Sequence, residues 1–219
     1  MADIKSIVER QRQYFLSGET LDVSFRLDAL KRLKAYIHNH EKDILEALKK
    51  DLNKSPFEAY ETEIGIVITE LNETIRNLRK WSRVKRVRTP LVLFKSSCYI
   101  VPEPYGVVLL MSPWNYPFQL SIVPLIGAIA GGNCAVLKPS AYSPAISALI
   151  SKLVKDCFDE KYITVVEGGR EANQDLLKTK FDYIFFTGSV NVGKTVMEAA
   201  SKYLTPVTLE LGGKNPCIV

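Results

Sequence analysis

The residues that could do chemistry gather at three points, and each point directly follows a short apolar run. They are residues 112–117 (SPWNYP), 138–140 (KPS) and 187–194 (TGSVNVGK). At the third point, Gly188 and Ser189 stand between an apolar run and a segment with helical periodicity. A helix that begins there presents free backbone N–H groups and the positive end of its dipole, and this arrangement binds an anion such as a pyrophosphate.

Two other interpretations of the third point stay open. The spacing from Gly188 to Gly193, with Lys194 and Thr195 next, matches the P-loop of nucleoside triphosphatases literally. A P-loop normally follows the first strand of its domain and needs a later acidic strand end to bind Mg²⁺, and neither feature is evident here. The last interpretation is a helix that Ser189 merely caps, with no ligand.

The elements that must position these residues follow from hydrophobic periodicity. Apolar residues recur at intervals of three and four in residues 1–80, which predicts a helical N-terminal part with helix starts at Ser24 and at Ser55-Pro56 and a helix over 57–78. Apolar runs at 107–111, 134–137, 163–166 and 183–186 predict strands buried on both faces. Helices are predicted at 121–130, 143–158 and 192–202. The order indicates an α/β fold with a parallel, Rossmann-like β-α-β sheet, which binds ligands at the carboxyl ends of its strands.

Residues 81–105 predict a strand-rich connector between these two parts. Apolar runs at 91–94 and 98–101 follow seven basic residues between 76 and 88. The basic run fits a solvated helix end that enters a hairpin, with phosphate contact as the alternative. The hairpin could pair with a second subunit.

Composition excludes several function classes. The net charge of +5 is too small to indicate a nucleic-acid partner, and the two histidines, His38 and His40, do not suit a metal site or a Ser-His-Asp triad. The four cysteines form no close pair, which favours a reducing cytoplasm over a disulfide framework. No secretory signal is visible, and the longest apolar stretch, 122–130, is too short to span a membrane, so no membrane partner is indicated.

Four motifs, taken in order, resemble the aldehyde dehydrogenase superfamily, most closely its short, class 3 type. They are PWNYP at 113–117, GGNCAVLKPS at 131–140, FFTGSVNVG at 185–193 and LELGGK at 209–214. The resemblance extends over essentially the whole chain. It implies oxidation of an aldehyde to a carboxylic acid through a cysteine thioester, with NAD or NADP as the hydride acceptor and a homodimer as the natural assembly.

The resemblance also implies roles for single residues. The amide of Asn115 would stabilise the oxyanion, and Glu210 would be the base that activates water for deacylation. An asparagine that holds a turn and a plain surface glutamate are the alternatives. The residues implied in cofactor binding are Trp114, Lys138, Ser140, Gly188, Ser189, Val190, Asn191, Val192, Gly193 and Leu211.

The sequence departs from the family pattern at two places. The family's nucleophilic cysteine follows the LELGGK motif, and none of the four cysteines here has that context; Cys134, Cys157 and Cys217 are instead predicted to be buried or half-buried. We therefore expect residues 106–208 to be the cofactor-binding core and 209–219 the start of a truncated catalytic domain that ends on an apolar strand at 215–219. At the second place, Ala141 replaces the glutamate that NAD-preferring members carry, which indicates that NADP is accepted.

Two other functions remain open beside the aldehyde dehydrogenase. One is a nucleotide-binding module without catalysis. The other is a reductase of acyl phosphates or acyl-CoA on the same fold, but such an enzyme dispenses with a hydrolytic base, so Glu210 argues against it.

Overall fold

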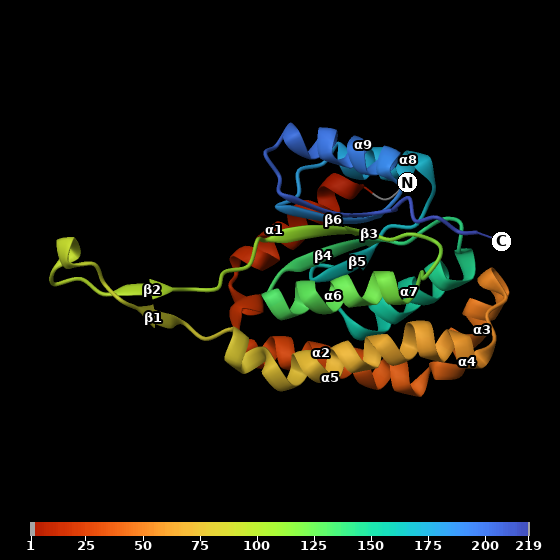
Figure 1. Ribbon diagram of the computed structural model, residues 1–219, viewed down its shortest axis with the longest axis horizontal. Coiled ribbons are helices and arrows are strands. Elements are labelled where there is room, and N and C mark those ends of the chain that lie inside the picture. The colour runs from red at the N-terminus through yellow and green to blue at the C-terminus, as the bar shows by residue number, and fades with distance from the viewer. Residues whose placement is uncertain (1–2, 219) are drawn as a thin grey trace.

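A parallel sheet of five strands lies at the centre of the computed structural model, which describes residues 3–218 (Figure 1). The strand order is β5-β4-β3-β6-β7, and every residue of β3 and β4 is buried. Burial on both faces explains the continuous apolar runs, and the predicted α/β fold is confirmed. The strands are β3 (Val107–Met111), β4 (Cys134–Lys138), β5 (Ile163–Val165), β6 (Tyr183–Gly188) and β7 (Val207–Leu211).

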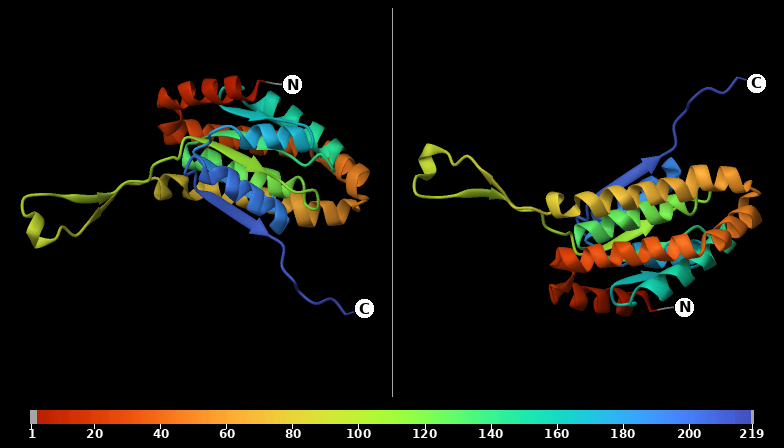
Figure 2. Two further views of the ribbon diagram at one scale, coloured as in Figure 1. Left: turned by 90° about the horizontal axis from the view of Figure 1, so that it is seen from above. Right: turned by 90° about the horizontal axis from the view of Figure 1, so that it is seen from below.

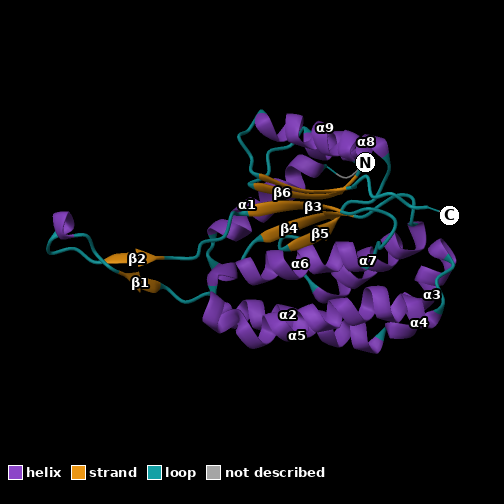
Figure 3. Ribbon diagram, in the orientation of Figure 1, coloured by secondary structure: helices purple, strands orange, loops and turns teal. Residues whose placement is uncertain are grey.

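Helices cover both faces of this sheet (Figure 3). One face packs against α6 (Gln119–Gly131) and α7 (Pro144–Cys157), and the other against α1 (Ile4–Leu16) and α9 (Val190–Ser201). The short helix α8 (Arg170–Leu177) lies beside α9. The sequence did not predict α8, because its eight residues are too few for a clear helical period.

A further helical layer covers α6 and α7 on the side away from the sheet (Figure 2). It consists of α2 (Val23–Asn39), α3 (Glu41–Leu52), α4 (Pro56–Ala59) and α5 (Gly65–Trp81), with a π turn, Tyr60–Ile64, between α4 and α5. The helix start at Ser55-Pro56 is confirmed, since the Ser55 side chain accepts from the N–H of Glu58. The start predicted at Ser24 is wrong: Asp22 is the capping residue, and its carboxylate accepts from the N–H of Ser24.

A two-stranded antiparallel hairpin projects from the amino end of the sheet's strands (Figure 1). It consists of β1 (Lys85–Val87) and β2 (Cys98–Ile100). The strand predicted at 91–94 is wrong, because Leu91–Leu93 form a turn of 3₁₀ helix at the tip. Pro90 precedes this turn, has no N–H to give to a strand ladder, and holds a φ of −59° that suits a helical turn.

The last residues differ from the expectation in two ways. Residues 212–218 have no regular structure, so the strand predicted at 215–219 does not form in the described part, and Cys217 is exposed rather than buried. Cys134 is buried and Cys157 half-buried, as predicted. The boundary expected between 208 and 209 falls inside β7, which is the fifth strand of the sheet. No helix within residues 3–218 is long and apolar enough to cross a bilayer.

Candidate functional site

The three chemically active loops and the end of β7 meet at one edge of the sheet because the strands are parallel and in register. Met111, at the end of β3, pairs with Lys138 on β4 and with Phe186 on β6. The β6–β7 ladder in turn places Glu210 beside Thr187. Residues far apart in the chain therefore lie together at the carboxyl ends of the strands, where this architecture binds ligands.

Two clefts open at this edge, with volumes of about 540 Å³ and about 830 Å³. They adjoin, since both are lined by Ser112, Ser140, Tyr142, Phe186 and Val192. We call them the β4 cleft and the β7 cleft, after the strands whose Lys138 and Glu210 line them. Together they form one groove that could hold an elongated ligand.

The β4 cleft contains a buried cation. Lys138 is 3% exposed, and within residues 3–218 its ammonium group makes one hydrogen bond, 2.8 Å to the carbonyl oxygen of Pro139. Burial lowers the pKa of Lys138 to about 8, although the nearby Glu167 opposes the shift. Asn173 lines the same cleft, and its buried Oδ1 has no partner among the described residues. These unused polar groups fit a ligand that carries hydroxyl groups.

The β7 cleft brings Asn115 and Glu210 to one surface. Both residues are exposed, and Trp114, Ser189 and Leu211 line the same cleft. The buried Oγ1 of Thr187, also at this cleft, has no partner within the described part of the chain. An amide donor and a carboxylate that line one cleft are groups that can polarise a carbonyl oxygen and accept a proton from water.

Helix α9 begins at this groove, two residues earlier than predicted. The Ser189 side chain accepts from the N–H of Val192 at 3.4 Å, so Val190 and Asn191 lie in the first turn. Gly193 is inside the helix, where a Cβ atom would lie 2.7 Å from Leu211 on β7. Residues between the two glycines are already helical, so the segment does not form the open loop of a P-loop, and that interpretation is wrong.

The structure brings together most of the residues expected in the site. Trp114, Asn115, Ser140, Gly188, Ser189, Val192, Glu210 and Leu211 line the β7 cleft, and Lys138 lines the β4 cleft. Val190, Asn191 and Gly193 shape the groove through α9 without lining it. The sequence analysis missed Arg170 and Asn173, which line the β4 cleft on α8. The Gly168-Gly169 pair after β5 was the available signal for a turn into a helix there.

Comparison with known proteins shows the family to which the chain belongs. The family model described as "Aldehyde dehydrogenase family" matches residues 1–219. The chain belongs to the aldehyde dehydrogenase family. A 4,4'-diaponeurosporen-aldehyde dehydrogenase of Staphylococcus aureus is 51% identical over 95% of this chain and 45% of its own length. Aldehyde dehydrogenase family 3 comG of Dictyostelium discoideum is also 51% identical, over 97% of this chain and 46% of its own length.

Solved aldehyde dehydrogenases have the same fold. The structure described as a substrate-bound state of Staphylococcus aureus AldH matches with a TM-score of 0.96 and 50% identity, over 99% of this chain and 47% of that one. A betaine aldehyde dehydrogenase of Staphylococcus aureus in complex with NAD⁺ matches with a TM-score of 0.87 and 26% identity, over 96% and 42%. This aldehyde dehydrogenase chain is thus of the class 3 type and spans about half the length of the curated relatives it matches.

The buried charge of Lys138 gives a prediction about stability and pH. Lysine in the unfolded chain ionises near its ordinary pKa of 10.5 and folded Lys138 near 8, so between these values the unfolded chain binds more protons. Burial of the charged form therefore lowers the free energy of unfolding by its full amount below pH 8. This destabilisation disappears as the pH approaches 10.5. Lys138→Met should raise the free energy of unfolding at pH 7 by about 1–3 kcal/mol and by much less near pH 10.5.

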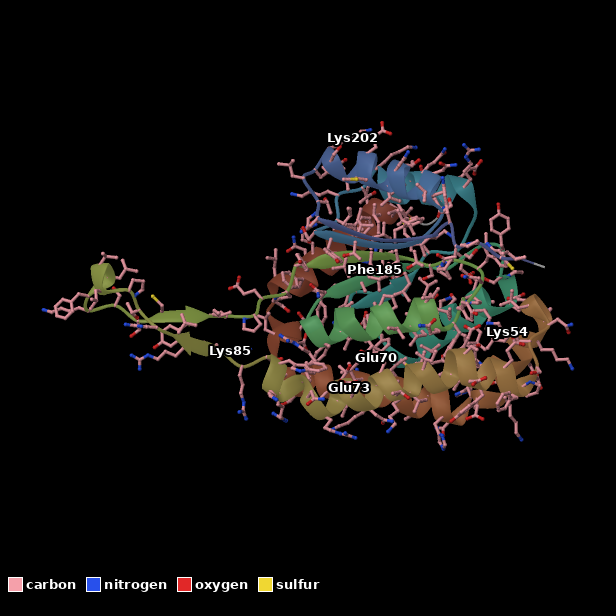
Figure 4. The ribbon with its side chains drawn as sticks, viewed as in Figure 1. Lys54, Glu70, Glu73, Lys85, Phe185 and Lys202 are labelled. Carbon is pink, nitrogen blue, oxygen red and sulfur yellow. The ribbon has the colours of Figure 1, made fainter. Side chains whose placement is uncertain are left out.

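Urea unfolding at both pH values measures this difference. Lys202→Met is the matched control, because Lys202 is exposed at the far end of α9 (Figure 4). A Lys138→Met chain that is less stable than its parent at pH 7 would contradict the assignment of an uncompensated buried charge.

Proposed function

We propose that this chain is the cofactor-binding half of an NAD(P)-dependent aldehyde dehydrogenase, which oxidises an aldehyde to a carboxylic acid. The observation that carries the proposal is the single groove at which Lys138, the start of α9, Asn115 and Glu210 meet in a chain of this family. The nucleophilic cysteine would belong to a catalytic domain that follows β7 and continues beyond this chain. The complete enzyme, below, means this chain together with that catalytic half.

The donors that line the groove support a nicotinamide dinucleotide as its ligand. Lys138 would donate to a ribose hydroxyl in the β4 cleft, and the first N–H groups of α9 would bind the pyrophosphate. Gly193 permits α9 to approach β7 closely, which sets the position of those N–H groups. When bound, the dinucleotide would supply the hydride acceptor for aldehyde oxidation.

Asn115 and Glu210 would act on the other end of the ligand. The neutral amide of Asn115 can donate to the oxygen that becomes negatively charged when a thiolate attacks an aldehyde. Glu210 is exposed at the cleft and can accept a proton from the water that attacks the thioester. Trp114 would form part of the wall between these groups and the dinucleotide.

The hairpin β1–β2 would bind a second copy of the chain, so that the enzyme is a homodimer. Leu91 and Val92 at its tip are each 90% exposed, and Phe94 is also exposed. Its two short strands pair only with each other within the described residues. An exposed apolar tip and unpaired strand edges are features that proteins cover by association.

Asn115→Ala in the complete enzyme tests the proposed function. Loss of one oxyanion donor should lower kcat about 10²–10³-fold, with the dissociation constant for NADH unchanged. The control is Asn77→Ala, because Asn77 is a half-buried asparagine on α5 that does not line the groove. Steady-state kinetics with an aldehyde and NAD⁺ gives the answer, and an Asn115→Ala enzyme within twofold of its parent would remove the residue from the mechanism.

Glu210→Gln separates a hydrolytic aldehyde dehydrogenase from an acyl-transferring reductase. If Glu210 is the deacylation base, the variant should form reduced cofactor rapidly in the first turnover and then stall while the thioester accumulates. Stopped-flow absorbance at the NADH band measures both phases, with exposed Glu198→Gln as the control. If the variant loses the burst and the steady-state rate equally, Glu210 acts before the thioester forms and is not only the deacylation base.

Ala141 leads to a prediction about cofactor choice. Two cations, Lys138 and Arg170, line the β4 cleft, and none of the described residues that line it is a carboxylate, so no acidic group of the cleft lining would repel the 2′-phosphate of NADP⁺. NADP⁺ should therefore be accepted. Ala141→Glu should shift the ratio of kcat/KM values toward NAD⁺ at least tenfold, which needs about 1.4 kcal/mol.

The matched control is Ala141→Gln, which has the size of the glutamate without its charge. It should leave the ratio near that of the parent. A parent enzyme that already rejects NADP⁺ by a hundredfold would show that another acidic group, such as Glu167, controls the choice.

A further inference from the structure

The loop that carries Asn115 is held by a residue from the outer helical layer. The ammonium group of Lys54 lies 3.3 Å from the carbonyl oxygen of Asn115 and 4.1 Å from the ring centre of Tyr116. Lys54 is 7% exposed and lines neither the β4 nor the β7 cleft. In Figure 4 it lies where α3 and α4 meet, at the end of the molecule at which the strands have their carboxyl ends.

A buried glutamate completes this arrangement. Glu63 is 0% exposed, and its Oε1 accepts from the Lys54 ammonium group at 2.6 Å. Its Oε2 accepts from the N–H groups of Phe118 at 2.8 Å and Gln119 at 3.1 Å, at the start of α6. One ion pair therefore binds the backbone on both sides of Pro117, which is two residues after Asn115.

Local backbone geometry places both partners. Lys54 follows Asn53, whose φ of +53° ends α3 in the left-handed conformation and turns the chain toward the loop. Glu63 lies in the π turn Tyr60–Ile64 that interrupts the helix between α4 and α5. Such π turns are rare in proteins, and those that do occur often lie at functional sites.

Stability alone does not account for this pair. A buried ion pair usually stabilises a fold no more than apolar residues of the same volume would. What it does provide is a fixed position for the groups to which it is bonded, and here those groups are the backbone of residues 115, 118 and 119.

We propose that Lys54 and Glu63 are positioning residues that fix the loop 115–119 and thereby aim the side-chain amide of Asn115 at the reacting oxygen. The inference rests on the proposed function of Asn115. Neither residue would touch the substrate, so they would act on turnover only through the loop.

The test is a double-mutant cycle in the complete enzyme. Glu63→Gln removes the charge and keeps the shape, and we expect it to lower kcat at least tenfold while the dissociation constant for NADH stays within twofold. In the Asn115→Ala background the same change should alter kcat less than twofold, because the group that it aims is already absent. If Glu63→Gln does not fold, Lys54→Arg takes its place, because it keeps the charge but changes the length and shape of the side chain. It should lower kcat by a smaller factor, and this loss should likewise disappear in the Asn115→Ala background.

Asp182→Asn is the matched control. Asp182 is also a carboxylate that pairs with a cation, Arg12 at 2.9 Å, and accepts from a backbone N–H, that of Val107 at 2.8 Å. It lies at the amino end of the strands, so its loss should lower the melting temperature and leave kcat unchanged. Equal losses of kcat from Glu63→Gln with and without Asn115 would overturn the positioning role.

A second readout does not depend on catalysis. Amide hydrogen exchange at Phe118 and Gln119 should become at least tenfold faster in Glu63→Gln and should not change in Asp182→Asn. Unchanged exchange would overturn the inference even if the parent enzyme did not oxidise aldehydes. Absence of aldehyde oxidation in the parent, with faster exchange in Glu63→Gln, would count against the proposed function alone.

Discussion

The parallel register of β4, β3, β6 and β7 is the constraint on which the rest of this structure depends. It aligns Met111 with Lys138 and with Phe186, and Thr187 with Glu210, so that every loop with chemically active residues leaves the sheet at the same edge. A shift of one residue in any of these ladders would turn the side chains of that strand to the opposite face. The packing of β3 and β4 opposes such a shift, since every residue of both strands is buried.

Polar groups gather at both ends of the sheet, and buried oxygens without a partner among the described residues occur at each end, including Gln11 Oε1 and the Tyr162 hydroxyl near the amino end. At the amino end, Asn133 accepts from the N–H of Gly106, and Asp182 accepts from Val107 and pairs with Arg12, so these polar groups are satisfied within the chain. At the carboxyl end, Lys138 has one hydrogen bond among the described residues, and buried oxygens of Asn173 and Thr187 have none. Unsatisfied buried groups cost stability, and those at the carboxyl end line the two clefts.

The sequence could predict the elements whose signal is local. The runs 107–111, 134–137 and 183–186 are apolar at consecutive positions, and they form β3, β4 and β6. The motifs on the loops after these strands also led to the correct family. Signals that depend on tertiary contacts were missed: α8 is too short to show a period, and Leu91–Leu93 form a turn because Pro90 cannot pair in a ladder. The hydrogen bonds from Lys54 and Glu63 to the loop 115–119 join segments whose proximity no spacing in the sequence indicates.

The outer helical layer explains why two of the helices that begin at this edge, α6 and α7, are closed to an anion. Helices α6 and α7 have no side-chain cap from their own N-cap residues in the described structure, and carboxylates of the outer layer bind their first N–H groups instead. Glu63 binds Phe118 and Gln119, while Asp51 binds the N–H groups of Ala145 at 3.1 Å and Ile146 at 2.8 Å. The positive ends of those two helix dipoles are thus already neutralised by the protein. Helix α9 receives no such carboxylate within residues 3–218, so it alone of these three presents its amino end to the groove.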